Sequence, residues 1–220
     1  MRNLLRDSGV GVFALLLITG CASTTDTGGA TAVSSASFEA REGRIEFESN
    51  AIADQRSSVM TAAIARFGQP RCSAIKTGLT NSRRAAVVED CVFELPTDKV
   101  SYAGTTIDTV SYRFLDGRLL QMNLEFKRSQ EFSRNPADGP VNSDKQRNMV
   151  ISALRLSLSE DLQLSDPYLS QSVSGSGSAT QWDAGQDSLV LEGNAASDSA
   201  TVRIFDQRVT PTVIAAKSSP

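Results

Sequence analysis

Residues 108–127, DTVSYRFLDGRLLQMNLEFK, decide the fold, because their alternation of apolar and polar residues predicts a β-hairpin. A two-residue loop at Asp116-Gly117 would place Tyr112 opposite Gln121 and divide the apolar side chains between both faces. A three-residue loop that ends at a left-handed Gly117 pairs Tyr112 with Leu120 and keeps one face apolar. The sequence therefore predicts the three-residue loop. The alternating apolar residues are Val110, Tyr112 and Phe114 on the first arm and Leu120, Met122, Leu124 and Phe126 on the second.

Two other stretches have the residue spacing of amphipathic helices. The first runs from Ala51 to Phe67, where Gly68 caps it and Pro70 prevents its continuation. Its predicted apolar face consists of Ile52, Val59, Met60, Ala63, Ile64 and Phe67. The second opens with Ser143-x-x-Gln146, which resembles a capping box, and its end near Leu158 is left open because the following residues alternate. Its apolar residues are Met149, Val150, Leu154 and Leu158.

Alternation predicts strands on both sides of the second helix. Residues 44–47 form a short strand, and residues 87–95, VVEDCVFEL, place Cys91, Phe93 and Leu95 on one face. A loop rich in Ser and Gly at 170–178 precedes three short strands near 179–183, 188–192 and 200–206. The order is therefore a helix and three strands, followed by a second helix and three strands.

This order predicts an α+β fold with helices packed on an antiparallel sheet. The segments Asp108–Phe126 and Asp187–Phe205 have equal length and similar beginnings, which leaves open two helix-plus-three-strand units in tandem. We expect a first unit at 38–127, a linker at 128–142, a second unit at 143–209 and a tail at 210–220. Residues 22–37 are small and polar with one valine, which predicts a flexible tether.

The beginning of the chain, MRNLLRDSGVGVFALLLITGC, has a positive start and an apolar run that is too short to span a bilayer. The run ends in Ile18-Thr19-Gly20-Cys21, which resembles the lipobox of bacterial lipoproteins. The resemblance implies that residues 1–20 are a signal peptide and that the mature chain starts at a lipidated Cys21. An ordinary secretory signal with an unrelated cysteine is the alternative. Because Ala22 follows the cysteine, the resemblance implies the periplasmic face of the outer membrane, with the inner membrane as the other location.

The remaining two cysteines, Cys72 and Cys91, would then lie in an oxidising compartment, which predicts a disulfide between them. Two free buried thiols are the alternative. The chain contains no histidine, which excludes Ser-His-Asp and Cys-His catalytic systems and zinc sites that use histidine. We therefore expect no enzyme activity, no cofactor and no metal.

Charge gives one candidate interaction segment. The formal net charge of −3 argues against a nucleic-acid partner. Within the predicted disulfide loop, basic residues gather without an acidic residue before Glu89, which suits an anionic partner. These basic residues are Arg71, Lys76, Arg83 and Arg84. A solvated charged loop without a partner is the alternative.

The stretch Phe67-Gly68-Gln69-Pro70 closes a helix before antiparallel strands. This resembles the SmpA/OmlA-type lipoprotein subunit of the outer-membrane protein assembly machinery, whose fold is related to β-lactamase inhibitor proteins. The resemblance implies protein–protein binding. We therefore expect a non-catalytic lipoprotein, anchored in the membrane by its lipid, that serves as a scaffold for an envelope protein. The alternative is a periplasmic binder of a small or lipidic ligand between the helix layer and the sheet.

Overall fold

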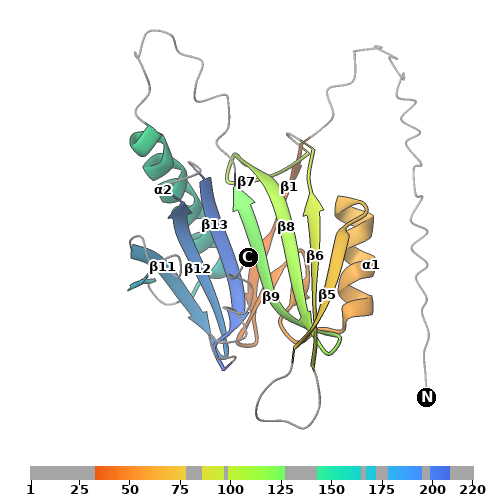
Figure 1. The fold of residues 1–220 in the computed structure, drawn as a ribbon. Helices are drawn as coiled ribbons and strands as arrows, with labels where there is room; N and C mark the ends of the chain where they lie inside the picture. Colours follow the sequence, from red (N-terminus) through yellow and green to blue (C-terminus); the bar gives the residue numbers. More distant parts are fainter. Residues whose placement is uncertain are drawn as a thin grey trace, which may run out of the picture. The chain divides into compact units, whose positions relative to one another are not determined.

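The computed structural model describes residues 33–77, 86–96, 99–126, 143–164, 167–171, 178–194 and 199–208. Within these ranges the chain forms thirteen strands and two helices, α1 (Arg56–Phe67) and α2 (Ser143–Leu162) (Figure 1). The strands are β1 (Ser34–Ser35), β2 (Phe38–Arg41), β3 (Arg44–Phe47), β4 (Asn50–Ala51), β5 (Arg71–Thr77), β6 (Ala86–Glu94), β7 (Val100–Tyr102), β8 (Thr105–Leu115), β9 (Arg118–Phe126), β10 (Tyr168–Gln171), β11 (Ser178–Ala184), β12 (Asp187–Asn194) and β13 (Ser199–Asp206). Neither of these helices is long and apolar enough to cross a membrane.

Eight strands build the body of one large antiparallel sheet, in the order β5-β6-β8-β9-β13-β12-β11-β10. β7 pairs with the first residues of β8, and β1 pairs with β7 in parallel. The two central strands, β9 and β13, are antiparallel neighbours. Their pairing runs from Ala200 opposite Phe126 to Phe205 opposite Gln121. Through this pairing, the regions 38–127 and 143–209 share one sheet.

The helices and a small sheet, β2-β3-β4, cover one face of the large sheet. α2 contacts β2, β12 and β13, and β3 contacts β12, so α2 and the small sheet lie behind the large sheet in Figure 1. One core of buried side chains lies between these layers. Six aromatic contacts, with ring centroids 4.7–6.5 Å apart, run through this core and connect its layers. The rings belong to Phe38, Phe47, Phe67, Phe93, Tyr102, Tyr112 and Phe114.

The predicted fold class, α+β with helices packed on an antiparallel sheet, is wrong. The fold is β-rich, with 57% strand and 22% helix among the described residues, and α1 precedes five strands of the large sheet and α2 precedes four, instead of three each. Three of these strands, β5, β7 and β10, were not predicted, and two of them, β5 and β10, are edge strands of this sheet. Edge strands need no continuous apolar face, and their sequences, RCSAIKT and YLSQ, do not show one. β1 also lies inside the stretch 22–37 that was predicted to be a tether.

The other predicted strands are confirmed. Residues 44–47 form β3, residues 87–95 fall largely in β6, and the three short C-terminal strands correspond to β11, β12 and β13. On β6, the side chains of Cys91 and Phe93 are buried as predicted, and Leu95 after it is buried too.

The hairpin of β8 and β9 forms as predicted, but the prediction of a three-residue loop is wrong. Leu115 pairs with Arg118, so the loop is Asp116-Gly117, and both residues have positive φ, as a type I′ turn requires. The register then shifts between Arg113 and Phe114, which pair with Gln121 and Leu119 respectively. Leu120 is thus an extra residue, a β-bulge, and it restores the apolar face that the short loop would have divided.

The first helix begins at Arg56, not at Ala51, although it ends at Phe67 as predicted. Ala51 pairs with Glu46 in the small sheet, and its backbone N–H donates to the carboxylate of Asp54 at 2.9 Å, which holds the chain in a turn. Gly68 has φ 97° and donates to Ile64, which confirms it as the C-cap. The second helix begins at Ser143 and continues beyond Leu158 to Leu162. Leu154 and Leu158 are buried as predicted, whereas Met149 is 50% exposed.

Candidate functional site

The predicted disulfide between Cys72 and Cys91 is confirmed. The two residues stand directly opposite each other on β5 and β6, with 4.1 Å between their Cα atoms. The Glu89 carboxylate lies close to both sulfur atoms, so that the ligand atoms of these three residues are within 4.8 Å of one another. The sulfurs are bonded to each other, however, and the Arg56 guanidinium donates two hydrogen bonds to Glu89, at 2.5 and 2.7 Å. This group of residues therefore cross-links α1, β5 and β6.

Only part of the predicted basic segment lies within the residues that the structure describes. Arg71 is exposed at the beginning of β5 and forms an ion pair of 2.7 Å with Glu94 on the neighbouring β6. Lys76 lies on β5, but its side chain is outside the described part of the chain, as are Arg83 and Arg84. Cys21 also lies outside the described residues. The interaction of this segment with an anionic partner therefore stays a prediction.

The face of the large sheet that points away from the core carries a different set of polar residues. Because side chains alternate along a strand, residues next to the buried Tyr112, Met122 and Ile204 point to this outer face. In Figure 1 it is the face turned toward the viewer. The strand register aligns its residues in two neighbouring rows. One row is Arg71–Val92–Ser111–Asn123–Arg203–Val190–Gln181–Tyr168, and the other is Ser73–Asp90–Arg113–Gln121–Phe205–Ser188–Asp183.

Five residues at the middle of this face form a hydrogen-bonded group that we name the central polar cluster: Ser111, Gln121, Asn123, Glu192 and Arg203. The Oδ1 atom of Asn123 accepts from Gln121 Nε2 at 2.5 Å and from Arg203 Nε at 3.2 Å. Asn123 Nδ2 donates to the Ser111 hydroxyl at 3.2 Å, and Arg203 Nη2 donates to the Glu192 carboxylate at 3.2 Å. The cluster thus connects β8, β9, β13 and β12.

The side chains of Gln121, Glu192 and Arg203 are largely buried, although no described helix or strand covers the outer face. Gln121 is 3% exposed, and the side chains of Arg203 and Glu192 are 16% and 7% exposed. Two buried atoms of the cluster, Gln121 Oε1 and Arg203 Nη1, have no hydrogen-bond partner among the described residues. A buried polar group without a partner costs about 1–3 kcal/mol, so the fold carries an energetic penalty at this position.

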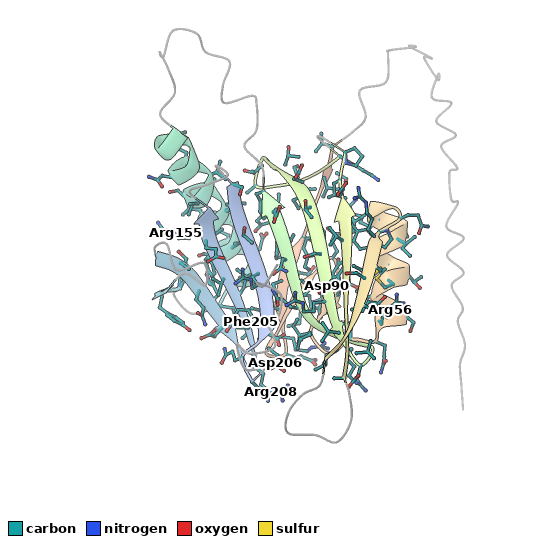
Figure 2. All side chains as sticks on the ribbon, viewed as in Figure 1. Arg56, Asp90, Arg155, Phe205, Asp206 and Arg208 are labelled. Atoms are coloured by element: carbon teal, nitrogen blue, oxygen red, sulfur yellow. A yellow bond between two sulfur atoms is a disulfide. The ribbon has the colours of Figure 1, made fainter. Side chains whose placement is uncertain are left out.

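Two polar groups flank the central polar cluster on the same face. On one side, Arg113 donates to the carboxylate of Asp90, which is labelled in Figure 2, at 2.7 and 3.3 Å. Both side chains are largely buried. On the other side, Asp183 accepts hydrogen bonds from Gln181, Ser188 and Tyr168. Burial alone would raise the pKa of the Asp183 carboxyl, but these hydrogen bonds together lower it. Partial burial and the bond to Asp183 raise the pKa of Tyr168 to about 12.

A pair of carboxylates lies at the end of β12 and β13. Asp187 and Asp206 are register partners and are both buried. Burial raises the pKa of Asp187, whereas hydrogen bonds from Arg208 lower the pKa of Asp206. Carboxyls with divergent pKa values occur in acid–base sites. Here, however, Asp187 accepts the backbone N–H of Ile45 at 3.1 Å and so connects the small sheet to β12, whereas Asp206 binds Arg208, two residues further along the chain, through both oxygens.

Sequence reasoning missed the central polar cluster, because no pattern in the chain indicates it. Ser111, Gln121 and Asn123 alternate with apolar residues in the predicted hairpin, which marks them only as residues of the outer face. Their proximity to Arg203 depends on the pairing of β9 with β13, which are far apart in the sequence.

Comparisons of the chain with protein-family models, with curated proteins and with solved structures found no match.

Proposed function

We propose that the chain is a non-catalytic lipoprotein whose folded part binds another protein of the bacterial envelope. The lipobox Ile18-Thr19-Gly20-Cys21 carries this proposal, because it supplies both the export signal and the cysteine that takes the lipid. The lipid holds the chain at the periplasmic face of the outer membrane. The Cys72–Cys91 disulfide supports this location, since such bonds persist in oxidising compartments and are rare in the cytosol.

The outer face of the large sheet is the proposed contact surface. It combines hydrogen-bonding groups in the middle with half-buried apolar side chains, such as Val92 and Phe205, in the same rows. Protein interfaces of this kind are about as apolar as the rest of a protein surface and gain specificity from hydrogen bonds. The basic segment that includes Arg71, Lys76, Arg83 and Arg84 is a second proposed contact, for an acidic region of the partner.

Metabolic labelling with a radioactive fatty acid tests the anchor, with the full chain expressed in a bacterial host. The expected result is labelled protein in the outer-membrane fraction and unlabelled protein for Cys21→Ser. Mass spectrometry of the N-terminus identifies the first mature residue. An unlipidated chain that begins at any residue other than Cys21 would contradict the proposed anchor.

Photo-crosslinking in intact cells tests the binding of a partner protein. A photoreactive amino acid is placed at 83 or at 125, and the captured species are identified by mass spectrometry. A reproducible envelope protein is the expected product, and Arg83→Glu with Arg84→Glu should lower the yield from position 83. Capture of lipid or a small molecule alone from both positions would contradict the proposal and favour a ligand-binding protein.

A further inference from the structure

We infer that residues 209–220 of this chain lie across the outer face of the large sheet and cover its side chains on β12, β13 and β9. The inference goes beyond the proposed function, because it concerns the chain alone and holds with or without a partner. Its starting point is the burial of this face. The uncovered face of an antiparallel sheet is in contact with water, and its side chains keep exposed area there.

Side chains on the outer face of β12 are buried as fully as those of the core. Ser188 is 0% exposed and Val190 is 2% exposed, and Gln121 on the nearby β9 is 3% exposed. The neighbours of Val190 on the adjoining strands are Arg203 and Gln181, which stand beside it in the sheet and not above it. The described part of the chain places no helix or strand over these side chains, so another segment covers them.

The described chain ends beside these buried residues. β13 ends at Asp206, which Figure 2 labels, and the backbone N–H of Gln207 donates to the carbonyl of Gln186 in the turn between β11 and β12. The side chain of Gln207 also hydrogen-bonds the carboxylate of Asp183, which lies on the outer face of β11 opposite Ser188. The chain therefore leaves β13 on the outer side of the sheet.

The other segments outside the described ranges join the sheet elsewhere. Residues 78–85 connect β5 with β6, on the far side of the sheet from β12. Residues 127–142 lead to α2, which packs on the core face, and residues 1–32 lead to β1, which pairs with β7. Residues 172–177 and 195–198 connect neighbouring strands at the end opposite to the one where β13 finishes. The segment after Arg208 is therefore the one whose attachment lies next to the buried side chains.

The length and the composition of this segment suit such a position. Residues 209–220 in an extended conformation span about 40 Å, at about 3.3 Å per residue. The distance across the sheet from β12 to β9 is about 10 Å, at about 4.8 Å between neighbouring strands. The sequence VTPTVIAAKSSP contains the apolar residues Val209, Val213 and Ile214 and a single charge, Lys217. Contact of these apolar side chains with Phe205, which is half-buried on the outer face, removes both from water.

This contact gives the outer face two occupants. A partner protein that binds the middle of this face must first displace residues 209–220. The affinity for the partner is then lowered by the fraction of molecules in which the face is open. Tests of the segment use the purified chain, where no partner is present, so their results do not depend on the proposed function.

Thiol labelling of Ser188→Cys tests whether residues 209–220 cover the face. The full chain and a chain that ends at Arg208 are treated with iodoacetamide, and peptide mass spectrometry follows the labelling of position 188. Deletion of the segment should raise the labelling rate at least about tenfold, because the buried side chain becomes accessible. Ala200→Cys, on the core face of β13, should stay protected in both chains. Glu125→Cys, exposed on β9, should react equally fast in both.

Two double substitutions in the full chain separate covering from a loss of folding. Val213→Asp with Ile214→Asp removes apolar contacts of the segment and should raise the labelling rate of Ser188→Cys by a similar factor. Ser218→Asp with Ser219→Asp adds the same charge but keeps the apolar residues, so the labelling rate should stay unchanged. These variants decide the question even where the truncated chain fails to fold.

A photoreactive residue at position 214 identifies what the segment contacts. The expected product is a crosslink within one molecule, to β9, β12 or β13, with a yield that does not change with protein concentration. A crosslink that forms only between two copies, or only to other parts of the chain, would overturn the inference. Equal labelling rates at position 188 in the full chain, the truncated chain and Val213→Asp with Ile214→Asp would overturn it as well.

Discussion

Gly185→Ala tests how the large sheet meets the small sheet. Gly185 lies in the turn between β11 and β12 with φ +60°, and a Cβ atom there would stand 2.5 Å from the carbonyl oxygen of Gly43. No side chain tolerates that distance, so one of the two turns must move. Beside this contact, the backbone N–H of Ile45 donates to the Asp187 carboxylate at 3.1 Å. Movement of either turn lengthens that hydrogen bond.

The size of the effect follows from two contributions. An alanine with left-handed φ costs about 1–2 kcal/mol relative to glycine. The clash adds the loss of a buried hydrogen bond to a charged group, about 1.5–3 kcal/mol. The expected loss in the free energy of unfolding is therefore about 2.5–5 kcal/mol. Gly117→Ala is the matched control, because Gly117 has φ +78° and its Cβ would meet nothing within 4 Å. It should lose only the first contribution, about 1–2 kcal/mol.

Urea unfolding followed by tryptophan fluorescence measures both variants. Trp182 is the only tryptophan in the chain, is 1% exposed and lies on β11, close to the substituted turn. The expected result is a lower midpoint for Gly185→Ala than for Gly117→Ala at an unchanged slope. If the two free energies of unfolding agree within about 0.5 kcal/mol, the argument from close contact between the two turns is refuted.

Three further variants test other interactions by the same urea assay. The double substitution Cys72→Ser with Cys91→Ser should lower the free energy of unfolding by about 3 kcal/mol, since the disulfide closes a loop with a sequence separation of 19. An unchanged free energy of unfolding would contradict a stabilising disulfide. Arg113→Met should lower the free energy of unfolding by about 3 kcal/mol, because it leaves the buried Asp90 carboxylate without this guanidinium. Adding Asp90→Asn to this variant should recover part of the loss, and strictly additive effects of the two substitutions would contradict the coupling. Asp187→Asn should be more stable than wild type at neutral pH. Burial raises the folded-state pKa of this carboxyl, so the wild type loses stability as the pH rises from below the unfolded-state pKa through the raised value. The difference in the free energy of unfolding between Asp187→Asn and wild type should vanish in acid. A variant less stable than wild type at neutral pH would contradict the expected direction.

The sequence predicted the central strands and failed at the edges, for one physical reason. A strand in the middle of a sheet with one buried face needs alternating apolar residues, and both arms of the 108–127 hairpin show them. β5 and β10 have a neighbour on only one side, and those of their side chains that the structure describes, at 71–74 and 168, are exposed. Their sequences therefore satisfy few constraints that alternation can detect, and the fold class predicted from the remaining strands contained too little β-structure.

The errors inside the predicted elements come from local interactions that compete with periodicity. Leu119 and Leu120 are consecutive apolar residues and interrupt the strict alternation of the hairpin. The prediction explained this with a three-residue loop, whereas the structure has a two-residue turn followed by a β-bulge at Leu120. Ile52 fits the apolar face of the first helix by spacing, and it is indeed buried, but it precedes the helix. The carboxylate of Asp54 binds the backbone N–H of Ala51 and the guanidinium of Arg44, which fixes a turn there.

The central polar cluster combines two requirements that a single sequence does not reveal. The first is register, because a slip of one residue between β9 and β13 would turn Arg203 into the core and Ile204 out of it. The hydrogen bonds from Arg203 to Asn123 and Glu192 act against such a slip. A network that served register alone would be most stable with every polar atom paired. Gln121 Oε1 and Arg203 Nη1, which have no partner among the described residues, depart from that optimum, and the contact that we propose for the outer face would be the second requirement.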